Sequence, residues 1–164
     1  DINLEDTNKY LVRFPKFKRV THMILAFDAE NLFLKSKSSY GYFFNLESLL
    51  TDLEESENRG YFVVAVTSNS SRQKQYNPYP RGEQENFATM HIESILEDHL
   101  PQIYGDYDID VSNLKKIVMG ASMGGLMSIK TGILSPSFEN IISLSPAFWF
   151  GFPGIVKDLK YLFL

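Results

Sequence analysis

Apolar runs alternate along this chain with segments in which apolar residues recur every three or four positions. Four of the runs are short and uninterrupted, at residues 23–27, 61–66, 117–119 and 141–144. A strand that is apolar on both faces is typical of a parallel sheet covered by helices on both sides. The pattern therefore predicts four parallel strands, each buried on both faces.

The segments between these runs have helical periodicity. One face of the first predicted helix carries four leucines, Leu46, Leu49, Leu50 and Leu53. Asn45 is placed as the N-cap of this helix, and Glu47 lies in its first turn. A second helix is predicted from Glu83 to about His99, ending before Pro101 because proline disfavours helical geometry in the residue that precedes it.

The first residues are more polar. We expect residues 1–8 to be frayed, and residues 10–14 to form an outer strand that ends at Pro15, which lacks a ladder donor. An amphipathic helix is predicted at residues 155–162. The alternation of strand and helix predicts one doubly wound, mostly parallel α/β domain over residues 1–164, with right-handed crossovers.

Ligands of such a sheet bind beyond the carboxyl ends of its strands, where loops 28–31, 67–80, 120–124 and 145–149 should meet. The loop at 67–80 is long and polar, and the sequence leaves open whether it is functional or a surface excursion. The aromatic residues at 148–150 are equally open between a pocket wall and core packing.

The loop at 120–124 reads Gly-Ala-Ser-Met-Gly between an apolar strand and an apolar helix. This order is the context of a G-x-S-x-G nucleophile elbow, in which Ser122 occupies a strained turn and glycines at 120 and 124 avoid collisions. The N–H of Met123 then lies at a helix N-terminus, where a developing negative charge is stabilised. The alternative is a glycine-rich turn that only packs the helix on the strand.

Composition excludes several other classes. The net charge is −4 without a cluster of basic residues, which argues against a nucleic-acid partner. The absence of cysteine excludes disulfides and thiolate chemistry, and no P-loop or dinucleotide motif is present, so we expect no metal and no cofactor. No apolar run reaches the ~20 residues of a membrane span. We expect a cytoplasmic protein with a small-molecule partner.

Five segments together resemble one known family. They are Phe27–Phe33, in which Ala29 stands where the family has glycine, the loop with Arg72, Leu100–Tyr104, Gly120–Gly125 and Ser143–Trp149. The chain is similar over most of its length to the "Putative esterase" family of α/β-hydrolases. That group includes enterochelin, feruloyl and acetylxylan esterases, S-formylglutathione hydrolase and the mycolyltransferases.

The resemblance implies that Ser122 is the nucleophile of a serine carboxylic-ester hydrolase. The backbone N–H groups of Met123 and Glu30 would form the oxyanion hole. The remaining candidates are substrate-pocket positions, namely Asp28, Asn31, Arg72 and Trp149.

One part of the family pattern is missing. The fold supplies its triad in the order Ser, Asp or Glu, His, and no histidine follows Ser122 in this chain. His22 and His99 are expected at the amino edge of the sheet, and His91 on the apolar stripe of its helix. The two late acids are not placed to complete the triad either, since Glu139 should precede a strand and Asp158 should be a solvated charge.

We therefore expect a hydrolase that lacks its carboxy-terminal acid and histidine, either a truncated chain or a naturally short protein. The alternative is a catalytically inactive α/β-hydrolase-like protein that binds a ligand or self-associates through an open sheet edge.

Overall fold

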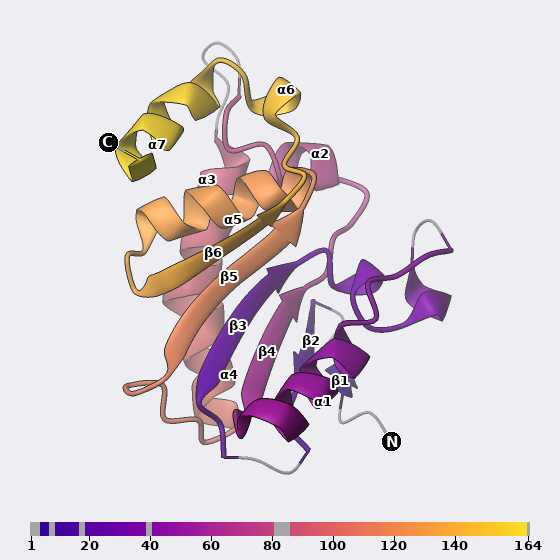
Figure 1. Cartoon of the computed structure of the whole chain (residues 1–164). Coiled ribbons are helices and arrows are strands. Elements are labelled where there is room, and N and C mark those ends of the chain that lie inside the picture. The colour runs from indigo at the N-terminus through magenta and orange to yellow at the C-terminus, as the bar shows by residue number, and fades with distance from the viewer. Residues whose placement is uncertain (1–3, 7–8, 17–18, 39–40, 81–85, 164) are drawn as a thin grey trace.

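The computed structural model describes residues 4–6, 9–16, 19–38, 41–80 and 86–163. Its centre is a six-stranded sheet in the order β1-β2-β4-β3-β5-β6 (Figure 1). The strands are β1 (Leu4–Asp6), β2 (Tyr10–Arg13), β3 (His22–Phe27), β4 (Tyr61–Val66), β5 (Lys115–Ala121) and β6 (Phe138–Leu144).

The four strands predicted from apolar runs are present and mutually parallel. β3 pairs with both β4 and β5, and β5 pairs with β6. Consecutive parallel strands need crossover connections, so the carboxyl ends of all four strands lie along one rim of the sheet. The predicted doubly wound α/β class is therefore confirmed.

Two amino-terminal expectations were wrong. Residues 4–6, expected to be frayed, form the edge strand β1, which pairs antiparallel with β2. β2 is therefore the second strand of the sheet, between β1 and β4, and not its outer strand. A three-residue edge strand is held mainly by backbone hydrogen bonds, so it leaves little periodic signal in the sequence.

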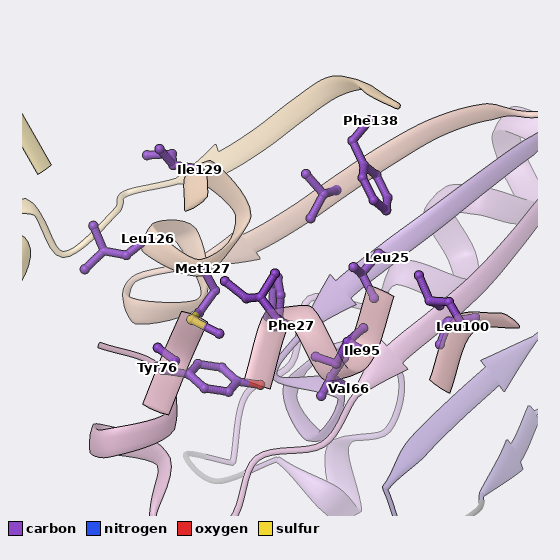
Figure 2. Close-up of a cluster of buried hydrophobic side chains, with 14 of the residues drawn as sticks. Leu25, Phe27, Val66, Tyr76, Ile95, Leu100, Leu126, Met127, Ile129 and Phe138 are labelled. Carbon is purple, nitrogen blue, oxygen red and sulfur yellow. The ribbon is translucent and has the colours of Figure 1, made fainter. Parts of the chain in front are cut away.

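Helices cover both faces of the sheet (Figure 1). One face packs against α1 (Leu46–Glu57), with Leu46 and Leu50 against Ile24 and Val63. The opposite face carries α3 (Phe87–Ser94) and α5 (Met123–Leu134). Figure 2 shows the core of this second face, where Tyr76 and Met127 lie beside Phe27. The two apolar faces of the central strands are thus both buried.

Helix α1 differs from its predicted face. Leu49, expected in the core, is 54% exposed. Glu47 and Glu54 are buried instead, and both accept hydrogen bonds from the fully buried guanidinium of Arg13. Asn45 does stand at the N-cap, but it is left-handed with φ 49° and its side chain accepts no capping hydrogen bond. A pattern of leucines does not reveal that an arginine on β2 draws two glutamates inward.

The second helix continues past the point at which it was predicted to end. After α3, a π-helical turn η3 (Ile95–His99) leads directly into α4 (Leu100–Asp106), with Pro101 in the first turn of α4. Proline lacks an N–H and crowds the carbonyl four residues earlier, and a wider π turn places its ring without ending the helix. The predicted start at Glu83 lies outside the described residues.

The last strand is less covered than predicted. β6 is an edge strand, and Ile142 and Leu144 on it are 40% and 41% exposed. Its first residues include Glu139, which therefore belongs to the strand and does not precede it. Beyond β6, the short helix α6 (Phe148–Gly151) leads to α7 (Gly154–Phe163), which confirms the helix predicted at 155–162.

The expectation that Asp158 is a solvated charge was wrong, because Asp158 on α7 pairs with residues of two other segments. Its carboxylate accepts hydrogen bonds from Lys130 Nζ and from the Tyr79 hydroxyl, each at 2.9 Å. Its side chain is 15% exposed. Asp158 thus fastens α7 to α5 and to the loop after β4. Among the described helices, none is long and apolar enough to cross a membrane.

Candidate functional site at the sheet rim

Ser122 lies between the end of β5 and the start of α5, as the motif predicted. Its backbone has φ 54° and ψ −116°, a conformation that costs a residue with a side chain of order 1–3 kcal/mol. The surrounding chain holds it there. Its N–H donates to the carbonyl of Leu144 at 3.0 Å, and its own carbonyl accepts from the N–H groups of Ala147 and Gly125 at 3.0 and 3.1 Å.

The two glycines of the motif are required by close packing. A Cβ on Gly120 would lie 2.2 Å from the carbonyl oxygen of Gly124, and a Cβ on Gly124 would lie 2.8 Å from Asp28 Oδ2. Both distances are shorter than the contacts that real Cβ atoms make. The glycines therefore allow α5 to start directly against β5 and against the end of β3.

The side chain of Ser122 is exposed, and it borders a cavity of about 510 Å³. The cavity lies between the rim and the segment that leads into α1. It is lined by Phe27, Asp28, Asn31, Leu32, Tyr42, Phe44, Leu46, Leu49, Arg72, Met119, Gly120, Ala121, Ser122 and Leu144. The structure thus brings Ser122 together with three of the four predicted pocket residues, Asp28, Asn31 and Arg72.

Asp28 and Arg72 form a bidentate ion pair on the wall of this cavity. Arg72 Nε donates to Asp28 Oδ1 at 2.6 Å, and Arg72 Nη2 donates to Oδ2 at 2.7 Å. Burial raises the pKa of the Asp28 carboxyl above its ordinary value, and the hydrogen bonds from Arg72 oppose that shift. The same hydrogen bonds raise the pKa of Arg72. The pair ties the loop after β4 to the end of β3.

Tyr76 supports this ion pair from below and was not singled out as a site residue. Its ring is fully buried, and Cζ of the Arg72 guanidinium lies over it, 5.1 Å from the ring centroid. Its hydroxyl accepts a hydrogen bond from the N–H of Asp28 at 3.4 Å. The loop at 67–80, which includes α2 (Arg72–Gln75), is therefore part of the rim and not a surface excursion. An aromatic residue four positions after the arginine, on the same side of a helical turn, was the available signal.

The two backbone donors predicted for an oxyanion hole occupy helix starts. Met123 is the first residue of α5, where the first N–H groups have no partner within the helix. Glu30 lies in the 3₁₀ helix η1 (Ala29–Asn31), and its carboxylate accepts hydrogen bonds from the N–H and hydroxyl of Ser68. The left-handed residue of this turn is Asp28, at φ 62°. Ala29 therefore needs no glycine-like backbone, and its methyl group is buried.

Trp149, the fourth predicted pocket residue, does not line this cavity. Its side chain is 77% exposed on α6 and packs edge-on against Phe150, with ring centroids 5.6 Å apart. Phe148 is also exposed, at 43%, whereas Phe150 packs against the core. The aromatic segment is thus divided between surface and core.

Neither His22 nor His91 lines the cavity beside Ser122. His22 begins β3 at the amino edge and contacts Tyr61, with ring centroids 5.0 Å apart. His91 stacks on Tyr76 at 6.4 Å, and burial, followed by the charge of His99, lowers its pKa. Of the described residues that line the cavity, none is a histidine.

The expected position of His99 was wrong. Its ring lies 5.4 Å from Tyr10, which pairs with Val66, the last residue of β4. His99 is therefore near the rim, because the helix continues through α4 and it is α4 that reaches the amino edge. Tyr10 on β2 is still three strands from β5, or about 14 Å at the usual strand spacing.

Comparisons with known proteins agree with this architecture. The sequence model of a family described as "Putative esterase" matches residues 4–153, whereas the curated proteins gave no match. Among solved structures, siderophore hydrolase EstB from Aspergillus nidulans has a TM-score of 0.69 and 20% identity, over 93% of this chain and 56% of that one. At this identity the likeness shows the fold alone.

Two further structures give the same result. The IroE-like serine hydrolase from Shewanella oneidensis has a TM-score of 0.67 and 18% identity, with 93% of this chain and 50% of that chain covered. The enterobactin esterase FES from Shigella flexneri has a TM-score of 0.60 and 16% identity, with 93% and 38% covered. This chain therefore spans between 38% and 56% of the length of these three structures.

Proposed function

Because the chain belongs to the esterase family described as "Putative esterase", we propose that it carries the nucleophile side of a serine carboxylic-ester hydrolase. Ser122 is the nucleophile. The observation that carries this proposal is the strained backbone of Ser122, which presents an exposed side chain to a cavity at the start of α5. A residue that served only to pack the turn would be a glycine, since only glycine adopts this conformation without strain.

The proposed reaction is acyl transfer. Ser122 Oγ attacks the ester carbonyl carbon while its proton passes to a general base, and the carbonyl oxygen becomes an oxyanion. The N–H groups of Met123 and Glu30 stabilise that charge. Collapse of the tetrahedral intermediate breaks the bond to the alcohol, which leaves with a proton from the base. Water then attacks the acyl carbon while the base takes its proton. Ser122 Oγ leaves with that proton, and the carboxylic acid is released.

The substrate contacts are assigned from the cavity. The pair Asp28–Arg72 holds the loops in place, and Asn31, whose Oδ1 accepts a hydrogen bond from the Ser38 hydroxyl at 3.3 Å, lines the same cavity. Trp149 would contact substrate only outside this cavity, from its exposed position on α6. The general base and its partner acid are proposed to come from a part of the hydrolase that these 164 residues do not include.

Turnover of p-nitrophenyl acetate by the 164-residue chain tests this assignment. Loss of the base costs on the order of 10⁴ to 10⁶ in kcat, and the turnover that remains comes from the oxyanion hole and binding, so we expect slow turnover that Ser122→Ala changes little. Covalent labelling of the chain by an organic fluorophosphonate that Ser122→Ala leaves unchanged would refute the nucleophile. A rate normal for an esterase would refute the proposal that these residues lack the general base. Loss of that rate in His91→Gln would then identify His91 as the base.

A second function, self-association, is favoured by one observation. The outer edge of β6 has no partner strand among the described residues, and Ile142 and Leu144 are exposed on it. An open edge with apolar side chains is a template for pairing with another chain. A protein without catalytic activity could use that edge to dimerise.

A further inference from the structure

The cavity beside Ser122 gathers apolar side chains that folding has left exposed. Tyr42 is 85% exposed, Phe44 55% and Leu49 54%, and all three line the cavity, as does the exposed Leu144 on β6. Single exposed apolar residues are ordinary, but several around one cavity mark a surface that a ligand covers. Leu49 is the clearest case, because its helix position predicted it to be core.

The wall that carries these side chains is held by the backbone. The N–H of Phe44 donates to the carbonyl of Asn31 at 2.9 Å, and the N–H of Leu46 donates to that of Leu32 at 2.9 Å. The Ser38 hydroxyl donates to the Tyr42 carbonyl. Since Asn31 belongs to η1, the wall is fixed to the turn that contains Glu30. A ligand there meets a preformed surface and loses little affinity to ordering it.

The charges on the wall are already paired. Among the described lining residues only Asp28 and Arg72 are charged, and they neutralise each other through two hydrogen bonds. An ionised group that entered the cavity would lose water without gaining a partner. The cavity is therefore suited to an uncharged occupant.

We infer that this cavity holds an uncharged, apolar acyl group of several carbons, seated against Tyr42, Phe44 and Leu49 with its ester carbonyl at Ser122. The inference rests on the proposed function, and it names the substrate class of the same site. The single methyl group of an acetyl ester would leave this wall uncovered. Longer acyl groups bury it, so chain length governs the strength of binding.

Binding is measured in the Ser122→Ala protein, so that no hydrolysis is required. Calorimetric titration uses the methyl esters of straight-chain acids from acetate to octanoate. Each added methylene should strengthen binding about fourfold until the cavity is filled. Hexanoate and hexylamine, which carry opposite charges, should each bind at least tenfold more weakly than methyl hexanoate. Affinity independent of chain length, or equal affinity for a charged probe, would overturn the inference.

Matched variants locate the wall. Phe44→Ser and Leu49→Ser, each made with Ser122→Ala, should weaken binding of methyl octanoate roughly tenfold. Phe87→Ser is the control, because Phe87 is 45% exposed on α3 and does not line the cavity. An equal loss in the control would refute the site. If the esters bind but Ser122 proves unreactive, the proposed function fails and the acyl pocket stands. If Ser122 is reactive but the esters do not bind as expected, only the acyl pocket is refuted.

Discussion

Replacing Gly120 by alanine tests whether the turn at Ser122 depends on contact between backbones. The added Cβ would lie 2.2 Å from the oxygen and 2.4 Å from the carbon of the Gly124 carbonyl. These are backbone atoms of α5, so no side chain can rotate to make room. Overpacking costs typically 1–3 kcal/mol, and we expect the upper end, about 3 kcal/mol, for this variant.

Gly124→Val provides a second perturbation of the same turn. Its Cβ would meet Asp28 Oδ2 at 2.8 Å, and that carboxylate is held by Arg72. We expect a cost of about 1–3 kcal/mol. Ser122→Ala should cost almost nothing or stabilise slightly, because the hydroxyl is exposed and does not pack.

Thermal melts followed by circular dichroism measure these differences. For a protein of this size 1 kcal/mol shifts Tm by roughly 2–4 °C, so Gly120→Ala should lower Tm by about 6–12 °C. Gly105→Ala is the matched control, because a Cβ at Gly105 on α4 meets nothing within 4 Å. It should leave Tm unchanged or raise it. If Ser122→Ala destabilises more than Gly124→Val, the serine is a structural hydrogen-bonding residue and the nucleophile assignment fails with it.

Three further perturbations address the rest of the fold. Arg13→Met leaves two buried glutamates without their cation and should cost about 3–5 kcal/mol, measured by urea unfolding, with no rescue by Arg13→Lys; a loss below 1 kcal/mol would contradict this. Arg72→Met removes the hydrogen bonds that oppose the raised pKa of Asp28, so that pKa rises further. Since a raised carboxyl pKa costs stability as pH increases, the Tm deficit of this variant should be larger at pH 7 than at pH 4.5, and a constant deficit would refute the pairing. Light scattering should show concentration-dependent association that Ile142→Lys on β6 reduces, whereas a monomer at high concentration would argue against an active edge.

The parallel core was predictable because its strands β3 and β4 are buried on both faces. Uninterrupted apolar runs such as Tyr61–Val66 have few other places in a globular fold. The alternation of these runs with helical segments then fixed the class, and the class placed the loops at one rim. Position in these loops predicted that Asp28, Arg72 and Ser122 would meet at one site, whereas the roles expected of them came from the family resemblance.

The predictions that were wrong concern residues whose structure depends on partners distant in sequence. Arg13 draws Glu47 into the core, which turns Leu49 outward, and no local pattern links β2 to α1. The predicted helix end before Pro101 was wrong, because the helix continues through a π turn that has no clear sequence signal. The same error displaced His99, since the helix proved longer than predicted.

Chemical labelling of the serines tests the central claim most directly. The purified chain is incubated with an organic fluorophosphonate at pH 9, where hydroxide can take the place of a general base, and the modified peptides are identified by mass spectrometry. The account predicts that Ser122 is labelled well before the other serines, and that Ser122→Ala removes this fast phase. Labelling spread evenly over the exposed serines, with Ser122 no faster than the rest, would contradict it.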